Sequence, residues 1–158
     1  MFKVGLGQDS HSFESDYKKE LVLGGIIIPN HPGFKANSDG DVILHAITNA
    51  ISSITGKRIL GSVADELCQA GISDSSHYLK LALADLSEFK IEHLAISVEG
   101  ASPKLSPYID EIRINLAKLL SIKPDQLGIT ATTGENLTKF GLGLGLQALA
   151  ILSVSKIT

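Results

Sequence analysis

Apolar runs divide this chain into short segments separated by glycine, proline and polar residues. Runs of this kind that end at turn residues predict β-strands. Strands are predicted at residues 2–8, 21–29, 91–98, 127–132 and 141–154. The second run contains Gly24-Gly25, a hairpin signal that splits it into two strands.

Helical spacing and end signals predict three helices, at about residues 38–55, 74–89 and 103–120. Ser38 can cap the first helix, with Asp41 three residues later as in a capping box, and Gly56 ends it. Pro103 falls in the first turn of the third helix. The order of strands and helices predicts an α/β (α+β-like) fold, with a mixed β-sheet covered by helices on one face.

Composition narrows the class of protein. The chain has 158 residues, 44% hydrophobic and 20% charged, so we expect a single globular domain over residues 1–158. A net charge of −3 and scattered lysines and arginines argue against nucleic-acid binding. No apolar run is long enough for a membrane span, and no targeting segment is expected. The single cysteine, Cys68, excludes an intrachain disulfide, and the expected compartment is the cytoplasm.

The stretch GLGQDSH near the N-terminus admits two interpretations. Gly5 and Gly7 could begin a dinucleotide-binding loop, but Ser10 stands where that motif has its third glycine, and no helix follows. Asp9 and His11 are two residues apart, so on an extended backbone both side chains point to the same side. The sequence therefore favours half of a metal site over a nucleotide loop.

His45 is the residue that can complete this site. It lies one turn after Asp41 on an otherwise apolar helix face. A lone histidine there is better explained as a core residue satisfied by one hydrogen bond. With Asp9 and His11 it would make a three-ligand tetrahedral site with an open fourth position, which is typical of catalytic rather than structural zinc.

Three further motifs carry candidate chemistry. Thr132-Thr133-Gly134-Glu135 follows a strand, and its hydroxyls and carboxylate could hold phosphate oxygens and Mg²⁺, although from these residues alone an ordinary polar turn is the better explanation. Ser102-Pro103-Lys104 offers N–H groups and a cation to an anion, but most such helix starts bind only water. The run GLGLGL at residues 141–146 predicts a tightly packed strand with every leucine on one side.

Five segments together resemble the 2-C-methyl-D-erythritol 2,4-cyclodiphosphate synthase family over nearly the whole chain: GLGQDSHSF, LGGIIIP, NSDGDVILHAI, ASPKLSPYI and ATTGENL. The resemblance implies the α/β domain of that family, assembled as a homotrimer with active sites between subunits. It also implies a reaction of non-mevalonate isoprenoid biosynthesis. In this reaction 4-diphosphocytidyl-2-C-methyl-D-erythritol 2-phosphate becomes the 2,4-cyclodiphosphate and CMP is released.

The resemblance also implies roles for individual residues. Asp9, His11 and His45 would hold Zn²⁺ or another divalent transition metal. Glu135 would hold Mg²⁺ or Mn²⁺ between the α- and β-phosphates of the substrate. Thr133 and Asn37 would act on the transition state. The residues implied to bind substrate are Ser38, Asp65, Gly100, Ala101, Ser102, Pro103, Lys104, Leu105, Ser106 and Thr132.

Several positions depart from the family pattern. Asn37 stands where the family has a histidine, and Arg58 where it has a ribose-binding aspartate. Leu142 and Leu144 replace an arginine and a glutamate that line a central cavity of the family trimer, which predicts an apolar cavity without strong diphosphate binding. The departures leave two alternatives open. One is a zinc-retaining trimer with lost or altered activity that acts as a binding or regulatory protein, and the other is a zinc-dependent phosphohydrolase.

Overall fold

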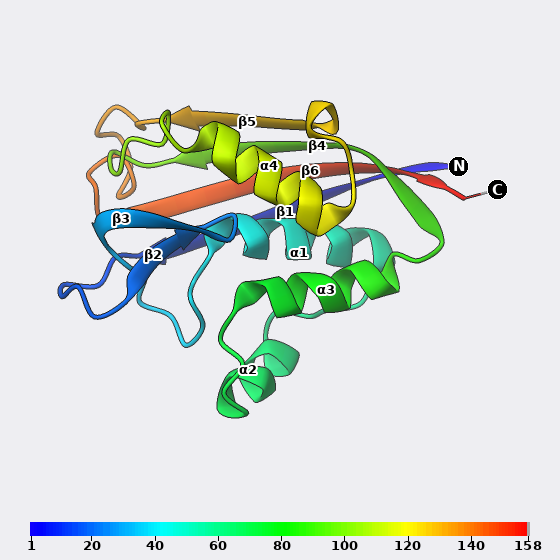
Figure 1. The fold of residues 1–158 in the computed structure, drawn as a ribbon, viewed down its shortest axis with the longest axis horizontal. Helices are drawn as coiled ribbons and strands as arrows, with labels where there is room; N and C mark the ends of the chain where they lie inside the picture. The colour runs from blue at the N-terminus through cyan, green and yellow to red at the C-terminus, as the bar shows by residue number, and fades with distance from the viewer. Residues whose placement is uncertain (158) are drawn as a thin grey trace.

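A four-stranded mixed β-sheet forms one layer of the molecule, and the helices lie together on one side of it (Figure 1). This computed structural model describes residues 1–157. The strand order is β1-β6-β4-β5, in which β4 and β5 are parallel and the other neighbours antiparallel. The strands are β1 (Phe2–Ser12), β4 (Phe89–Glu99), β5 (Leu127–Thr132) and β6 (Gly145–Lys156). The predicted fold class is confirmed.

The second layer consists of helices and a β-hairpin. The helices are α1 (Val42–Thr55), α2 (Ser62–Gln69), α3 (Ser75–Asp85) and α4 (Ile109–Leu120), and a 3₁₀ turn η1 (Pro124–Gln126) precedes β5. The hairpin joins β2 (Glu20–Leu23) to β3 (Ile26–Pro32) through Gly24-Gly25, as the sequence predicted. Within residues 1–157, no helix combines the length and apolar character needed to cross a bilayer.

Helix α1 packs closely on β1 because β1 presents glycine there. Gly7 is buried on the face of β1 that contacts α1, and a Cβ atom added to it would lie 1.9 Å from the carbonyl oxygen of Ala46. Side chains alternate between the faces of a strand, so Asp9 and His11 continue the face of Gly7. The close approach therefore brings α1, with His45 on it, next to Asp9 and His11.

The other face of the sheet carries no helix in the described part of the chain (Figure 1). This uncovered face is apolar. Val4 and Leu6 of β1 are 67% and 60% exposed, and Ile151 of β6, which pairs with Leu6, is 50% exposed. Contiguous apolar surface of this kind is typical of a face that another protein chain covers.

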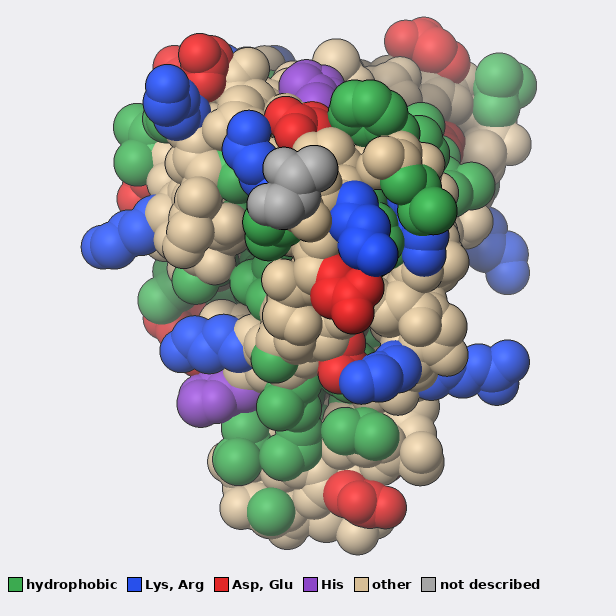
Figure 2. Space-filling view, turned by 90° about the vertical axis from the view of Figure 1, so that its right-hand side faces the viewer, with side chains coloured by type: hydrophobic (Ala, Val, Ile, Leu, Met, Phe, Trp, Pro, Cys, Tyr) green, Lys and Arg blue, Asp and Glu red, His purple; other side chains and the backbone are tan. Residues whose placement is uncertain are grey.

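Charges of both signs are mixed on the end of the molecule at which the termini lie (Figure 2). Lys and Arg side chains are interspersed with Asp and Glu side chains on this face, without an extended basic patch. The two termini are neighbours there because Phe2 of β1 pairs with Ser155 of β6. Neither sign of charge dominates this end of the molecule.

Several predicted element boundaries were wrong. Helix α1 begins at Val42 and not at residue 38, and α3 ends at Asp85 and not at about residue 89. The third predicted helix, α4, begins at Ile109 and not at Pro103, because Pro107 cannot sit inside a helix and disfavours helical geometry at the residue before it. Residues 141–144 form a turn and not the start of the last strand. Leu142 and Leu144 are consequently 59% and 55% exposed, so the predicted one-sided leucine stripe is absent.

The residue that caps the N-terminus of α1 was also predicted wrongly. Ser38 does not cap α1. The N-cap is Asp41, whereas the Ser38 hydroxyl accepts a hydrogen bond from the backbone N–H of Gly40 at 3.1 Å.

Helix α2 was not predicted at all. Its apolar residues Val63, Ala64 and Leu67 have helical spacing, but the segment is only 8 residues long and has no side-chain cap at Gly61, so it is too short for the pattern to stand out.

Asp41 connects α1 to the β2–β3 hairpin. Its fully buried carboxylate accepts hydrogen bonds from the backbone N–H groups of Ile43 and Leu44 in α1, at 3.1 and 3.0 Å. It also accepts from Gly24 and Gly25 in the hairpin turn, at 2.9 and 2.7 Å. Burial raises the pKa of Asp41 to about 6, although these backbone donors act in the opposite direction.

We expect Asp41→Asn to lower the free energy of unfolding by about 1–3 kcal/mol, because an amide N–H₂ would face backbone N–H donors. The folded pKa lies above the unfolded value of 3.8, so the stability that Asp41 contributes falls as pH rises from about 4 to above 6. The difference between wild type and variant in urea unfolding should therefore be larger at about pH 4 than at about pH 7. Asp74→Asn, at the cap of α3, is the matched control and should cost little. An equal cost at both positions would contradict the prediction.

Candidate metal centre and substrate pocket

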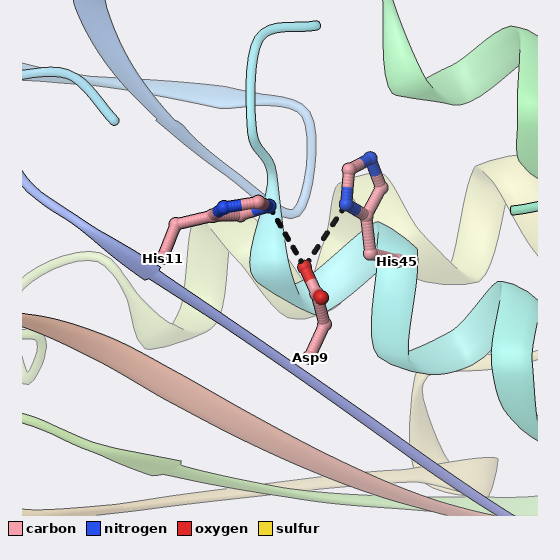
Figure 3. A group of neighbouring side chains, drawn as sticks. All are labelled: Asp9, His11 and His45. Carbon is pink, nitrogen blue, oxygen red and sulfur yellow. Dashed lines mark hydrogen bonds and ion pairs between the residues drawn. The ribbon is translucent and has the colours of Figure 1, made fainter. Parts of the chain in front are cut away.

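Asp9, His11 and His45 converge on one point from β1 and α1 (Figure 3). The Nδ1 atom of His45 lies 3.0 Å from Asp9 Oδ2, and the Nε2 atom of His11 lies 3.2 Å from the same oxygen. One ligand atom from each residue lies within 4.8 Å of the others. The structure thus brings together the three residues that the spacing and the apolar helix face singled out.

The geometry fits a divalent metal ion. Ligand atoms about 2.0–2.1 Å from a tetrahedral zinc ion are about 3.3 Å apart, close to the two distances seen here. The contact of His11 Nε2 with Asp9 lacks hydrogen-bond geometry, so this buried nitrogen has no hydrogen-bond partner among residues 1–157. A buried polar atom without a partner is unfavourable, and a bound ion would satisfy it.

The charge state of Asp9 also suits a cation. Burial raises the pKa of the Asp9 carboxyl, but the neighbouring imidazoles of His11 and His45 lower it by more, so the net direction is down. Asp9 is therefore an anionic ligand at neutral pH beside two imidazoles. One carboxylate and two histidines are a common ligand set for zinc and related transition metals.

A pocket of about 440 Å³ opens beside the three ligands. Asn37 and Ser38, in the loop before α1, and Asp65, on α2, line it together with Asp9, His11 and His45. The structure therefore places these three predicted substrate residues beside the metal ligands. Lys35 also lines this pocket and was missed, because nothing in the sequence distinguishes it from other exposed lysines.

A second, smaller pocket of about 220 Å³ lies at the end of β5. Thr132 and Thr133 form one wall of this pocket. The other wall is the turn between β4 and α4, whose lining residues are Gly100, Ala101, Pro103, Lys104, Leu105 and Ser106. Ser102 is the remaining predicted residue of this turn. Its hydroxyl oxygen lies 3.4 Å from Nε2 of His31. The predicted cytidine-binding residues thus form one concave surface.

Glu135 belongs to the loop that follows β5. The hydroxyl of Thr133 donates a hydrogen bond to Glu135 Oε1 at 3.1 Å, and both side chains are exposed. Gly134, Glu135 and Asn136 have φ angles of 73°, 49° and 61°, which folds the loop back tightly. The loop presents a carboxylate and a hydroxyl together, next to the second pocket.

The two pockets lie at the same end of the sheet but at opposite edges. Strand β1, which carries Asp9 and His11, is one edge strand, and β5, which leads to Thr133, is the other. Three interstrand spacings of about 4.8 Å separate them, or about 14 Å. A single chain therefore does not bring the predicted metal ligands and Thr133 into one site.

The sequence profile of the YgbB family matches residues 2–155. The chain belongs to the YgbB family. A relative from Chlamydia muridarum, named 2-C-methyl-D-erythritol 2,4-cyclodiphosphate synthase, is 55% identical over 157 residues, covering 98% of this chain and 88% of the relative. A relative of the same name from Chlamydia caviae is 49% identical over 159 residues, covering 99% of this chain and 90% of the relative. The resemblance found in the sequence is confirmed.

Solved structures of YgbB-like proteins agree over the whole fold. The Plasmodium falciparum protein IspF, in a complex with CDP, is 26% identical, covers 99% of this chain and 97% of its own, and has a TM-score of 0.86. The bifunctional IspDF of Campylobacter jejuni is 28% identical with a TM-score of 0.85, and the match covers 99% of this chain and 43% of that longer protein.

Proposed function

We propose that this chain converts 4-diphosphocytidyl-2-C-methyl-D-erythritol 2-phosphate to 2-C-methyl-D-erythritol 2,4-cyclodiphosphate and CMP, as a phosphorus–oxygen lyase of isoprenoid biosynthesis. One observation carries the proposal. Asp9, His11 and His45 converge with the geometry of a metal centre beside a pocket, in a chain that is 55% identical to a relative named for this activity.

The reaction needs no nucleophile from the protein. An oxygen of the 2-phosphate attacks the β-phosphorus of the diphosphate, and a new P–O–P link closes the ring. The bond between the β-phosphorus and the oxygen bridging to the α-phosphate breaks, and its electron pair leaves with CMP. Because attacking and leaving groups belong to one substrate, the protein must mainly hold two like-charged groups in line.

Asp9, His11 and His45 would hold Zn²⁺ or a similar ion, and Glu135 would hold Mg²⁺ or Mn²⁺. When bound, these ions supply positive charge that neutralises and orients the phosphates. The hydroxyl of Thr133 is exposed beside Glu135, where it can donate a hydrogen bond to a phosphate oxygen.

The pocket residues have separate roles in this scheme. Asn37 donates a hydrogen bond to a phosphate oxygen but carries no charge, and Lys35 in the same pocket supplies a cation. Ser38 and Asp65 hold the substrate in the first pocket. The turn from Gly100 to Ser106 and Thr132 bind the cytidine end in the second pocket. A cytidine nucleotide as ligand is consistent with the CDP complex of the Plasmodium falciparum relative.

We further propose that three chains form a homotrimer in which each active site combines the first pocket of one chain with the second pocket of another. Two features support this assembly. The two pockets lie on opposite edge strands of the sheet, and the uncovered face around Leu6 and Ile151 is apolar. Burial of such a face between chains is favourable. We place the reaction in the cytoplasm, because the one cysteine fits a reducing compartment.

The experiment that tests the function is CMP release from the diphosphocytidyl substrate, measured before and after metal removal. We expect protein treated with a chelator to lose CMP release by about 100-fold or more, because the phosphates then repel each other without compensation. Addition of Zn²⁺ together with Mg²⁺ should restore it. Activity that survives complete metal removal would contradict the proposal.

Two other results would support different functions. A protein that binds zinc but releases no CMP would favour the binding or regulatory alternative. Hydrolysis of simple phosphate esters such as p-nitrophenyl phosphate, without cyclisation, would favour a phosphohydrolase.

A further inference from the structure

A chain of hydrogen bonds leads away from the metal centre through His45. The Nε2 atom of His45 lies 2.8 Å from the hydroxyl oxygen of Ser75, which is completely buried at the start of α3. The Ser75 hydroxyl donates to Oδ1 of Asp39, and the Ser75 backbone N–H donates to Oδ2 of the same carboxylate at 3.0 Å. Neither Ser75 nor Asp39 contacts the predicted metal position.

The direction of the hydrogen bonds fixes the protonation of the imidazole. The one hydroxyl hydrogen of Ser75 points to the Asp39 carboxylate, which can only accept. The hydroxyl oxygen must therefore accept from His45, and Nε2 of His45 must carry a hydrogen. In a neutral imidazole this leaves the lone pair on Nδ1, which lies 3.0 Å from Asp9 Oδ2, and a metal ion bound to both atoms replaces the unfavourable contact between two acceptors.

We propose that Asp39 and Ser75 are positioning residues that hold His45 in the tautomer and ring orientation needed to bind the metal through Nδ1. Histidine ligands commonly donate their second N–H to such a partner, which raises the basicity of the ligand and orients its ring. The sequence does not predict this contact, because Ser75 lies 30 positions after His45. Only the packing of α3 on α1 brings the Ser75 hydroxyl beside the imidazole.

Asp39 is itself held firmly. Its Oδ1 also accepts from the backbone N–H of Asp41 at 3.0 Å, and its own N–H donates to the carbonyl of Ser73 at 2.9 Å. Asp39 thus joins the loop before α1 to the loop before α3. An Asn at this position could rotate so that its N–H₂ donates to Ser75, and the Ser75 hydroxyl would then donate to His45. That change moves the imidazole hydrogen to Nδ1, where it blocks the metal.

The first test is Zn²⁺ binding by the metal-free chain, measured by competition with a chromophoric chelator. Ser75→Ala and Asp39→Asn should each weaken Zn²⁺ binding by about 10- to 100-fold. The matched controls are Ser76→Ala, the next residue of α3, and Asp74→Asn, its N-cap, and both should bind Zn²⁺ like wild type. Equal Zn²⁺ affinity in all four variants and wild type would overturn the proposal.

A second measurement needs no variant. In wild type loaded with Zn²⁺, the imidazole ¹⁵N chemical shifts of His45 should show hydrogen on Nε2 and metal bound at Nδ1. Binding of Zn²⁺ through Nε2, with hydrogen on Nδ1, would overturn the proposal even if the variants failed to fold. The inference rests on the metal centre of the proposed function but not on its substrate. Wild type that binds Zn²⁺ without releasing CMP would overturn the function and leave this inference standing.

Discussion

His11→Ala should reduce CMP release by about 100-fold or more and abolish tight Zn²⁺ binding. The alanine removes the one ligand atom that is buried without a hydrogen-bond partner, so its loss takes no hydrogen bond from the folded chain. Stability of the metal-free protein should consequently change little. Metal content by atomic spectroscopy, CMP release and thermal unfolding of the metal-free chain separate these effects.

His77 provides a matched control outside the metal centre. His77→Ala removes an imidazole from α3 and should retain metal and activity. A His11→Ala protein that still binds Zn²⁺ as tightly as the His77→Ala protein would contradict the assignment of the ligands.

The same variant tests whether active sites are shared between chains. His11→Ala damages the pocket at β1, and Glu135→Ala damages the loop after β5. In mixed trimers, some sites would combine the intact β1 pocket of one chain with the intact β5 loop of another. We expect co-refolded mixtures of these two inactive chains to regain a measurable fraction of wild-type CMP release. A mixture that remains as inactive as its components would argue for a site within one chain.

Gly7→Ala should lower the free energy of unfolding by about 3 kcal/mol, at the upper end of typical overpacking costs. The added methyl carbon would lie 1.9 Å from the carbonyl oxygen of Ala46 and 2.4 Å from the backbone nitrogen of Ala50. These are main-chain atoms of α1, so only a shift of the helix can relieve the contact. Because His45 belongs to this helix, we also expect weaker Zn²⁺ binding.

Gly128→Ala is the control for this prediction, since no atom lies within 4 Å of a Cβ added at Gly128. Denaturant unfolding of both variants should show a large loss only for Gly7→Ala. If the Gly7→Ala protein unfolds at the same denaturant concentration as the Gly128→Ala protein, the close packing of α1 on β1 is not a determinant of stability.

The metal ligands could be predicted because each left a local signal. The two-residue spacing of Asp9 and His11 places both side chains on one face of a strand. His45 interrupts an apolar helix face, and a buried imidazole requires a polar partner. The family resemblance supplied the remaining residues, Glu135 and Thr133 among them, because their own sequence context fits an ordinary turn.

Other features had no local signal. Helix α2 is amphipathic but has only 8 residues and no side-chain N-cap, so its pattern is too short to predict a helix. Asp41 caps α1 through the nearby N–H groups of Ile43 and Leu44, but its bonds to Gly24 and Gly25 join segments that are distant in sequence and meet only in the folded chain. The leucines at positions 142 and 144 alternate with glycine as in a strand, yet the chain turns there. Ser75 and Asp39 likewise acquire their place beside His45 only through the packing of α3 on α1.

The pairing of Phe2 with Ser155 has a consequence for how this domain tolerates rearrangement of its chain. Neighbouring termini allow a short linker to join them, and new ends can then be opened elsewhere (Figure 1). The exposed turn between α2 and α3, near Gly71, is one place where a circularly permuted chain could begin. A second domain can likewise be fused at this end of the sheet, while the pockets lie toward the opposite end of β1 and β5. The bifunctional Campylobacter jejuni relative, of which this fold occupies 43%, is consistent with such a fusion.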